Sequence, residues 1–166
     1  MAELDMSAAK LMDVGEKKAL ADTKKYGCHA IHVLAEGDLP PFSYSVGIQR
    51  SSGAHELAVI GLKRPLAHFI LNEYNQRVRT GERFVPGQFA SGFVEGFKCQ
   101  FRPVHRSHYR AYFGWNVWLY KGNRFKILQL VYPTTDGVWP WDARATEWFR
   151  TWQPLLERPI ARVTRE

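Results

Sequence analysis

Glycine and proline residues divide the apolar residues of this chain into short runs, and the shortness of these runs limits the folds that the chain can adopt. Short runs rich in β-branched and aromatic residues predict strands, because an amphipathic helix needs a longer periodic segment. We expect strands at residues 28–34, 42–48, 56–62 and 93–102, and a hairpin of residues 117–121 and 124–132 around Gly122 and Asn123. The run Leu-Ala-Val-Ile at residues 57–60 predicts a strand that is buried on both faces.

Helical periodicity marks four further segments. The first helix is expected to begin at Asp13, whose spacing to Glu16 matches a capping box, and to end at Gly27. A second is expected from Pro65 to Gly81, and a short one over residues 105–113. Asp142 is the expected cap of a last helix, whose apolar stripe is Ala145, Trp148, Phe149 and Trp152. Residues 49–54 and 82–92 predict polar loops.

The order of these elements does not alternate strictly between strand and helix, which argues against a parallel sheet of βαβ units. We therefore expect an α+β fold with a mostly antiparallel sheet and flanking helices. The chain has 166 residues, which suits a single domain. We place that domain at residues 13–156, with an N-terminal tail at residues 1–12 and a C-terminal tail at residues 157–166.

The apolar runs also bear on where the protein works. None approaches the roughly 18 residues that a membrane helix needs, so we expect no membrane partner. Residues 1–10 carry Glu3 and Asp5 and lack the apolar core of a signal peptide, which predicts a cytoplasmic protein. Cys28 and Cys99 are far apart in the sequence, and we expect both to be buried free thiols.

Positive charge is concentrated in one stretch of the chain. The net charge is +7, and residues 96–135 contain seven Lys and Arg side chains but no Asp or Glu. Elsewhere the 16 other basic side chains are balanced by the 16 acidic ones. This stretch predicts an anionic partner, with nucleic acid and an acidic protein as the alternatives. The expected ligand-binding residues are Arg102, Arg106, Arg110, Lys121, Arg124 and Lys126.

Aromatic residues are interleaved with these charges and allow two interpretations. Exposed rings beside cations are typical of surfaces that bind single-stranded nucleic acid. Alternating strands give the same pattern when the rings form the core and the charges face solvent. The rings concerned are Phe97, Phe101, Tyr109, Tyr112, Phe113, Trp115, Trp118, Tyr120, Phe125 and Tyr132.

The chain contains none of the standard nucleotide-binding, hydrolase or metalloprotease fingerprints, and we predict no cofactor. The six histidines have no spacing typical of a metal site, so we also predict no bound metal. Adjacent strands would bring Tyr44, Ser45, His55 and Glu56 to one end of the sheet. A hydroxyl, an imidazole and a carboxylate suit proton transfer or nucleophilic attack, so these four are the candidate catalytic residues. The alternative is that they form structural hydrogen bonds.

A tryptophan-rich loop precedes the predicted last helix, at residues 136–142. Trp139 and Trp141 would form a stacking surface for a ligand, next to the carboxylates of Asp136 and Asp142. The alternative is that the two indoles are buried and fix the loop.

Several of these segments resemble a known family. The motifs are residues 42–48 (Phe-Ser-Tyr-Ser-Val-Gly-Ile), His55-Glu56-Leu57, Gly61-Leu62, residues 129–133 (Gln-Leu-Val-Tyr-Pro), Asp136-Gly137, Pro140-Trp141-Asp142 and Gln153-Pro154. In this order they are similar to the bacterial domain-of-unknown-function family 4262, over roughly residues 13–156. That family often has Thr in place of Ser45, Pro in place of His55 and Trp in place of Tyr132. The resemblance implies a single-domain protein of a bacterium or phage.

Three functions remain open from the sequence. The first is a binding protein whose basic, aromatic-rich face takes a phosphate-bearing ligand or nucleic acid. The second is a small hydrolase or transferase that acts on a nucleotide-like or phosphorylated compound. The third is a protein-interaction factor, such as an immunity or anti-defence protein, whose cations attract an acidic partner.

Overall fold

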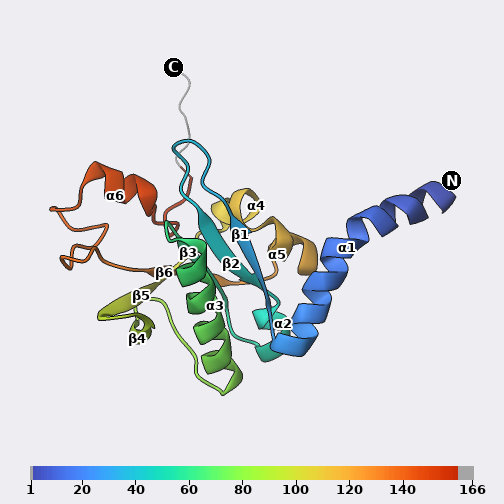
Figure 1. Ribbon diagram of the computed structural model, residues 1–166, viewed down its shortest axis with the longest axis horizontal. Coiled ribbons are helices and arrows are strands. Elements are labelled where there is room, and N and C mark those ends of the chain that lie inside the picture. Colours follow the sequence, from blue (N-terminus) through green and yellow to red (C-terminus); the bar gives the residue numbers. More distant parts are fainter. Residues whose placement is uncertain (1, 161–166) are drawn as a thin grey trace.

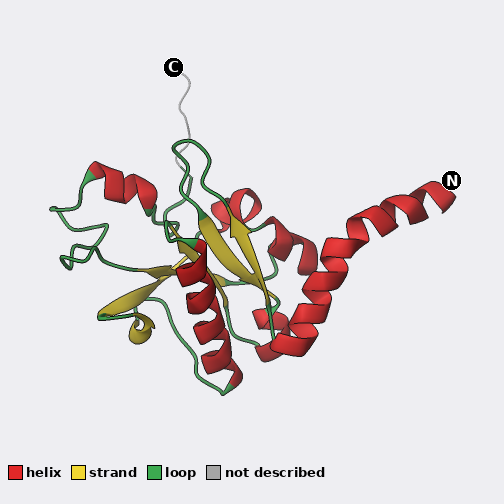
Figure 2. Cartoon of the chain, in the orientation of Figure 1, coloured by secondary structure: helices red, strands yellow, loops and turns green. Residues whose placement is uncertain are grey.

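A single six-stranded sheet forms the centre of the molecule (Figure 2). The structure is a computed structural model that describes residues 2–160, with side chains from residue 14 onward. The strand order is β1-β2-β3-β6-β5-β4. The strands are β1 His29–Val33, β2 Phe42–Val46, β3 Glu56–Ile60, β4 Phe89–Val94, β5 Phe97–Pro103 and β6 Ile127–Val131.

All neighbouring strands are antiparallel except β3 and β6, which run parallel, with Glu56 opposite Ile127. The expected α+β fold with a mostly antiparallel sheet is therefore confirmed. Every residue of β3 and of β6 is buried, as the Leu-Ala-Val-Ile run predicted for β3. These two strands lie in the middle of the sheet, where both faces are covered.

Helices cover the two faces of the sheet (Figure 1). Helix α3, Arg64–Arg79, packs on one face, and the short helices α4, Tyr109–Tyr112, and α5, Gly114–Leu119, pack on the other. The pleat of β3 explains the division. Leu57 and Val59 point into the core beneath α3, while Ala58 and Ile60 point into the core beneath α4 and α5.

The remaining helical segments are α1 Ala2–Tyr26, α2 Ile48–Ser52, the 3-10 turn η1 Arg106–His108 and α6 Glu147–Trp152. The N-terminal part of α1 extends away from the sheet (Figure 1). Gly27 ends α1 as predicted, because its φ of 96° lies in the left-handed region and its N–H donates to the carbonyl of Thr23 at 2.9 Å.

Several predicted helix boundaries are wrong. Helix α1 begins at Ala2 and continues through Asp13, so the start predicted at Asp13 is incorrect. Helix α6 begins after Thr146, whose hydroxyl accepts from the N–H of Phe149, and not after Asp142. Residues 49–54, predicted as a loop, lie largely in α2. Of the expected C-terminal tail, residues 161–166 lie outside the described residues, as does Met1.

Two strand predictions also need correction. Residues 93–102 are not one strand, because β4 and β5 form a hairpin that turns at Glu95 and Gly96. The hairpin predicted around Gly122 and Asn123 is wrong, since residues 114–119 are helical and β6 pairs with β3 and β5 instead. Trp115 and Trp118 contact each other on α5 at a centroid distance of 5.6 Å. The predicted first run, residues 117–121, is so short that its residue pattern does not distinguish a strand from a helix, which explains the error.

The buried thiols are confirmed: Cys28 and Cys99 are both free and buried. Burial raises the pKa of Cys28 to about 12 and that of Cys99 to about 11, so both stay protonated at neutral pH. In the part of the chain that the structure describes, no helix is long and apolar enough to cross a membrane.

Candidate functional site

Glu56, the first residue of β3, is fully buried together with Ser45 of β2. Its carboxylate accepts hydrogen bonds from the hydroxyls of Ser45 (2.8 Å) and Tyr120, and from the backbone N–H groups of Gly47 (3.2 Å), Ile48 (3.0 Å) and Gln49 (3.0 Å). Three of these donors are the otherwise unpaired N–H groups at the start of α2. Glu56 therefore caps a helix from a neighbouring strand, in a place that solvent does not reach.

Tyr120 is a member of this buried cluster that the sequence did not reveal. Burial and the neighbouring Glu56 carboxylate raise the pKa of Tyr120, so its hydroxyl stays protonated and donates to Glu56. Burial likewise raises the pKa of Glu56, and the hydrogen bonds from Tyr120, Gln49, Ser45 and Ile48 act against that rise. Tyr120 lies 64 residues from Glu56, and no local pattern links the two.

The structure separates the four candidate catalytic residues. Ser45 and Glu56 lie together, but the ring of Tyr44 points into the core beneath α5, where it contacts Phe113. The hydroxyl of Tyr44 accepts from the N–H of Trp115 at 3.2 Å. His55 lies on the rim of a surface pocket instead. The geometry thus supports the alternative of structural hydrogen bonds for Ser45, Glu56 and Tyr44.

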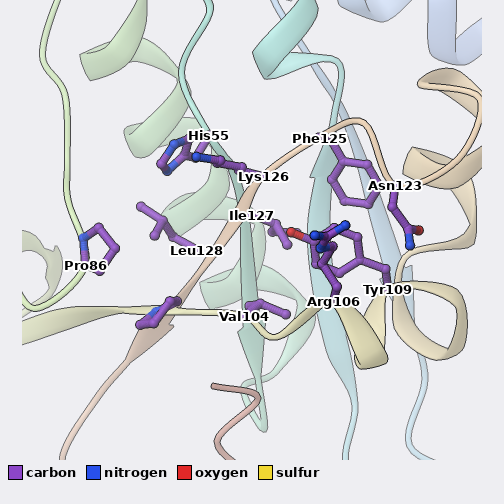
Figure 3. A pocket seen from close by; sticks show the side chains of 11 residues that line it. His55, Pro86, Val104, Arg106, Tyr109, Asn123, Phe125, Lys126, Ile127 and Leu128 are labelled. Carbon is purple, nitrogen blue, oxygen red and sulfur yellow. The ribbon is translucent and has the colours of Figure 1, made fainter. Parts of the chain in front are cut away.

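The pocket beside His55 has a volume of about 510 Å³ (Figure 3). Its polar lining comes from four separate segments: His55 before β3, Arg106 and Tyr109 of η1 and α4, Asn123 after α5, and Lys126 before β6. Val104, Ile127 and Leu128 add apolar surface. In Figure 3, His55 and Lys126 lie on one side of the pocket and Arg106 and Tyr109 on the other. We call this cavity the His55 pocket.

The His55 pocket is electropositive. None of its lining residues is acidic. Arg106 and Lys126 are exposed, and within the described residues neither makes an ion pair. Burial, and secondarily the charge of Lys126, lower the pKa of His55, so its imidazole is neutral at pH 7. Its Nδ1 is buried and has no hydrogen-bond partner among the described residues.

Gln49 joins the buried cluster to the pocket. Its side-chain oxygen accepts from the N–H of Lys126 at 3.0 Å, and its side-chain amide donates to the carbonyl of Arg124 at 3.0 Å. The N–H of Glu56 also donates to the carbonyl of Lys126 at 2.9 Å. Because Glu56 holds the start of α2 and α2 carries Gln49, the buried carboxylate fixes the segment that brings two cations to the pocket.

Stacked rings support the opposite side of the pocket. Tyr109 and Phe125 are buried and lie nearly parallel, with their centroids 4.4 Å apart. This contact fixes α4 against residues 123–126. A shallower hollow of about 410 Å³ adjoins the pocket, shares His55, Asn123, Phe125 and Lys126 with it, and adds Arg124.

The predicted ligand-binding residues divide into three groups. Arg106, Arg124 and Lys126 line the pocket or its adjoining hollow. Arg110 and Lys121 are exposed outside these linings. The third group lies elsewhere: Arg102 pairs with Glu157 and lies over the ring of Trp141, which stacks on Trp139. Eight of the ten interleaved rings belong to the two core clusters or pack against them, and Phe97 and Trp118 are half-buried outside these clusters.

Asn123 and Tyr109 are pocket residues that are not among the predicted ligand-binding residues. The sequence places Asn123 in a hairpin turn and Tyr109 among the ten interleaved rings. Their chemical types alone carry no signal. Within the described residues, no group of three or more His, Cys, Asp or Glu side chains is placed to hold a metal ion.

Comparison with known proteins gives one match. A family model described as "Domain of unknown function (DUF4262)" matches residues 22–146, a span that contains every lining residue of the His55 pocket. No curated protein and no solved structure matches the chain. The match confirms, at the level of the family, the resemblance seen in the sequence motifs.

Proposed function

We propose that this chain, which belongs to the DUF4262 family of domains of unknown function, binds a phosphate-bearing ligand in the His55 pocket. One observation carries the proposal: basic side chains from separate segments, Arg106 and Lys126, line the same pocket as neutral His55, and no lining residue is acidic. Like charges repel each other, so two cations in one pocket without an acidic partner favour an anion between them.

The chemistry of the lining suits phosphate in particular. An arginine side chain presents paired N–H donors that match two phosphate oxygens, and a lysine adds a compact charge. Asn123 adds an amide that can donate or accept. The volume of about 510 Å³ is within the range of small-molecule sites, and the apolar lining suits a nucleoside or another organic group attached to the phosphate.

Binding is favoured over catalysis by the burial of the candidate catalytic groups. Ser45 and Glu56 are fully buried, and the Glu56 carboxylate already accepts five hydrogen bonds. Neither side chain reaches a ligand in the pocket. A concave pocket also suits a small anion better than the flat surface of an acidic protein does.

The test compares AMP with adenosine by isothermal titration calorimetry at low and at physiological salt. We expect AMP to bind and adenosine to bind at least about tenfold more weakly, since charged hydrogen bonds contribute about 1.5–3 kcal/mol each. Arg106→Glu should abolish most of the AMP affinity. Arg110→Glu is the matched control, because it reverses the same charge four residues away and outside the pocket. Equal losses in both variants, or equal binding of AMP and adenosine, would contradict the proposal.

Binding should also depend on pH through His55. The pKa of free His55 lies below its ordinary value of 6.5, and an anion in the pocket would raise it by favouring the imidazolium form. Affinity is therefore expected to rise as the pH falls from about 7 to about 5 and to be constant above this range. The probe is a dinucleoside monophosphate, whose phosphodiester keeps its charge throughout. Burial raises the pKa of Tyr109, so Tyr109 stays neutral in this range and His55→Gln should remove the increase. The same pH slope in the variant would exclude His55 from the site.

A further inference from the structure

A second hollow is lined in part by Arg158, which belongs to the segment that lies along η1. Residues 156–160 run along η1 and make three contacts with it. The N–H of His105 donates to the carbonyl of Leu156 at 2.7 Å, and the N–H of Ile160 donates to the hydroxyl of Ser107 at 3.0 Å. Nε2 of His108 lies 2.6 Å from the carbonyl oxygen of Arg158. The hollow has a volume of about 330 Å³ and is lined by Pro140, Trp141, Arg150, Gln153, Leu155 and Arg158. We call it the Trp141 hollow.

Trp141 is held in place and yet is 45% exposed. Trp139 lies parallel to it, with the ring centroids 5.1 Å apart, and the guanidinium of Arg102 lies 5.2 Å from the ring centre. Arg102 in turn pairs with Glu157. Trp139 and Arg102 cover the faces of the indole, so its exposed part is the ring edge, which lines the hollow and offers a nucleobase an apolar contact at little cost in side-chain entropy.

The charges around this hollow match those of the His55 pocket. The acidic side chains Glu157 and Asp142 are already paired, with Arg102 and Arg144 respectively. Arg150 and Arg158 are exposed, and among the described residues neither forms an ion pair. The guanidinium of Arg150 donates to the backbone carbonyl of Asp142 at 2.9 Å. Because residues 156–160 lie against η1, Arg158 of this hollow and Arg106 of the His55 pocket belong to adjoining segments.

We propose that the natural ligand is a single-stranded nucleic acid that runs from the His55 pocket across η1 to the Trp141 hollow. This inference rests on the proposed function, since one phosphate of the strand occupies the His55 pocket. Arg158 and Arg150 contact further phosphates, and a base packs on the exposed part of Trp141. A duplex is disfavoured because its bases are already stacked on each other, whereas an unpaired base is free to contact an indole.

The experiment measures fluorescence anisotropy of labelled mono-, di-, tetra- and octanucleotides, with the duplex and inorganic polyphosphate as competitors, at two salt concentrations. Affinity should rise with strand length and fall with salt more steeply for the octanucleotide than for AMP, because more phosphates are contacted. Trp141→Ala should weaken octanucleotide binding by about threefold while AMP binding is unchanged, because the base loses its apolar contact with the exposed edge of the indole. Arg158→Glu should act in the same direction.

Matched controls separate local effects from general ones. Lys98→Glu makes the same change in net charge as Arg158→Glu at an exposed site outside both cavities, and Trp148→Ala removes an exposed indole that lines neither. AMP binding without any gain from strand length would overturn the inference and leave the His55 pocket standing. Competition by duplex or polyphosphate equal to that by the single strand, with Trp141→Ala neutral, would also overturn it. If the unmodified protein did not bind AMP at all, both the proposed function and this inference would be wrong.

Discussion

Replacing Glu56 by alanine is expected to lower the free energy of unfolding by about 4 kcal/mol, since several buried donors lose their acceptor at once and each costs about 1–3 kcal/mol. The affected groups are the N–H groups of Gly47, Ile48 and Gln49 and the hydroxyls of Ser45 and Tyr120. Urea unfolding followed by tryptophan fluorescence measures the change. Glu56→Gln keeps the size of the side chain but replaces one acceptor oxygen by a donor, so we expect a smaller loss of about 2 kcal/mol.

Glu95→Ala is the control for this prediction. Glu95 is exposed in the turn between β4 and β5, and its removal should change stability by no more than about 0.5 kcal/mol. If Glu56→Ala proved as mild as Glu95→Ala, the carboxylate would not hold the start of α2. A full-stability Glu56 variant that lost a ligand-dependent activity would instead restore Glu56 as a catalytic candidate.

Gly47→Ala should destabilise the protein by a similar amount, about 3–4 kcal/mol. Gly47 adopts a φ of 101°, in the left-handed region that disfavours a Cβ atom. That Cβ would also lie 2.3 Å from Oγ1 and 2.5 Å from Cγ2 of Thr23, on the buried side of α1. Both penalties act together because α1 packs directly on the turn between β2 and α2.

Gly53→Ala separates these two penalties. Gly53 has a φ of 78° at the other end of α2, but no heavy atom lies within 4 Å of its added Cβ. We therefore expect only the cost of backbone strain, about 1 kcal/mol. Thermal unfolding by circular dichroism compares the two variants. Equal shifts in the melting temperature would show that contact with Thr23 adds nothing.

The two predictions meet at one place in the molecule. Gly47 provides the turn that lets α2 begin, and Glu56 accepts the hydrogen bonds that α2 leaves unpaired. The side chain of Gln49 then bonds the backbone of Arg124 and Lys126, and so positions the rim of the His55 pocket. The residues with the largest effects on stability are thus those that support the pocket and not those that would touch a ligand.

Elements with a strong local signal were predictable. The apolar runs located β1, β2 and β3, and the periodicity from Pro65 to Gly81 located α3. The hairpin predicted around Gly122 failed because a run as short as residues 117–121 fits a short helix as well as a strand. Helix α5 is instead held by a contact with a strand distant in the sequence: Asn116 is fully buried, and its side-chain amide donates to the carbonyl of Ser45 at 2.9 Å.

The sequence by itself determined the α+β class, the burial of both cysteines and the confinement of net charge to residues 96–135. These properties follow from composition and short-range periodicity, which local burial and propensity govern. Only the tertiary structure decided that Glu56 is a buried cap and that His55, Arg106 and Lys126 share one pocket. The physical reason is that these relations depend on hydrogen bonds and packing between segments tens of residues apart. Such contacts form only when the sheet order brings β3, β6 and η1 together, and no local pattern records that order.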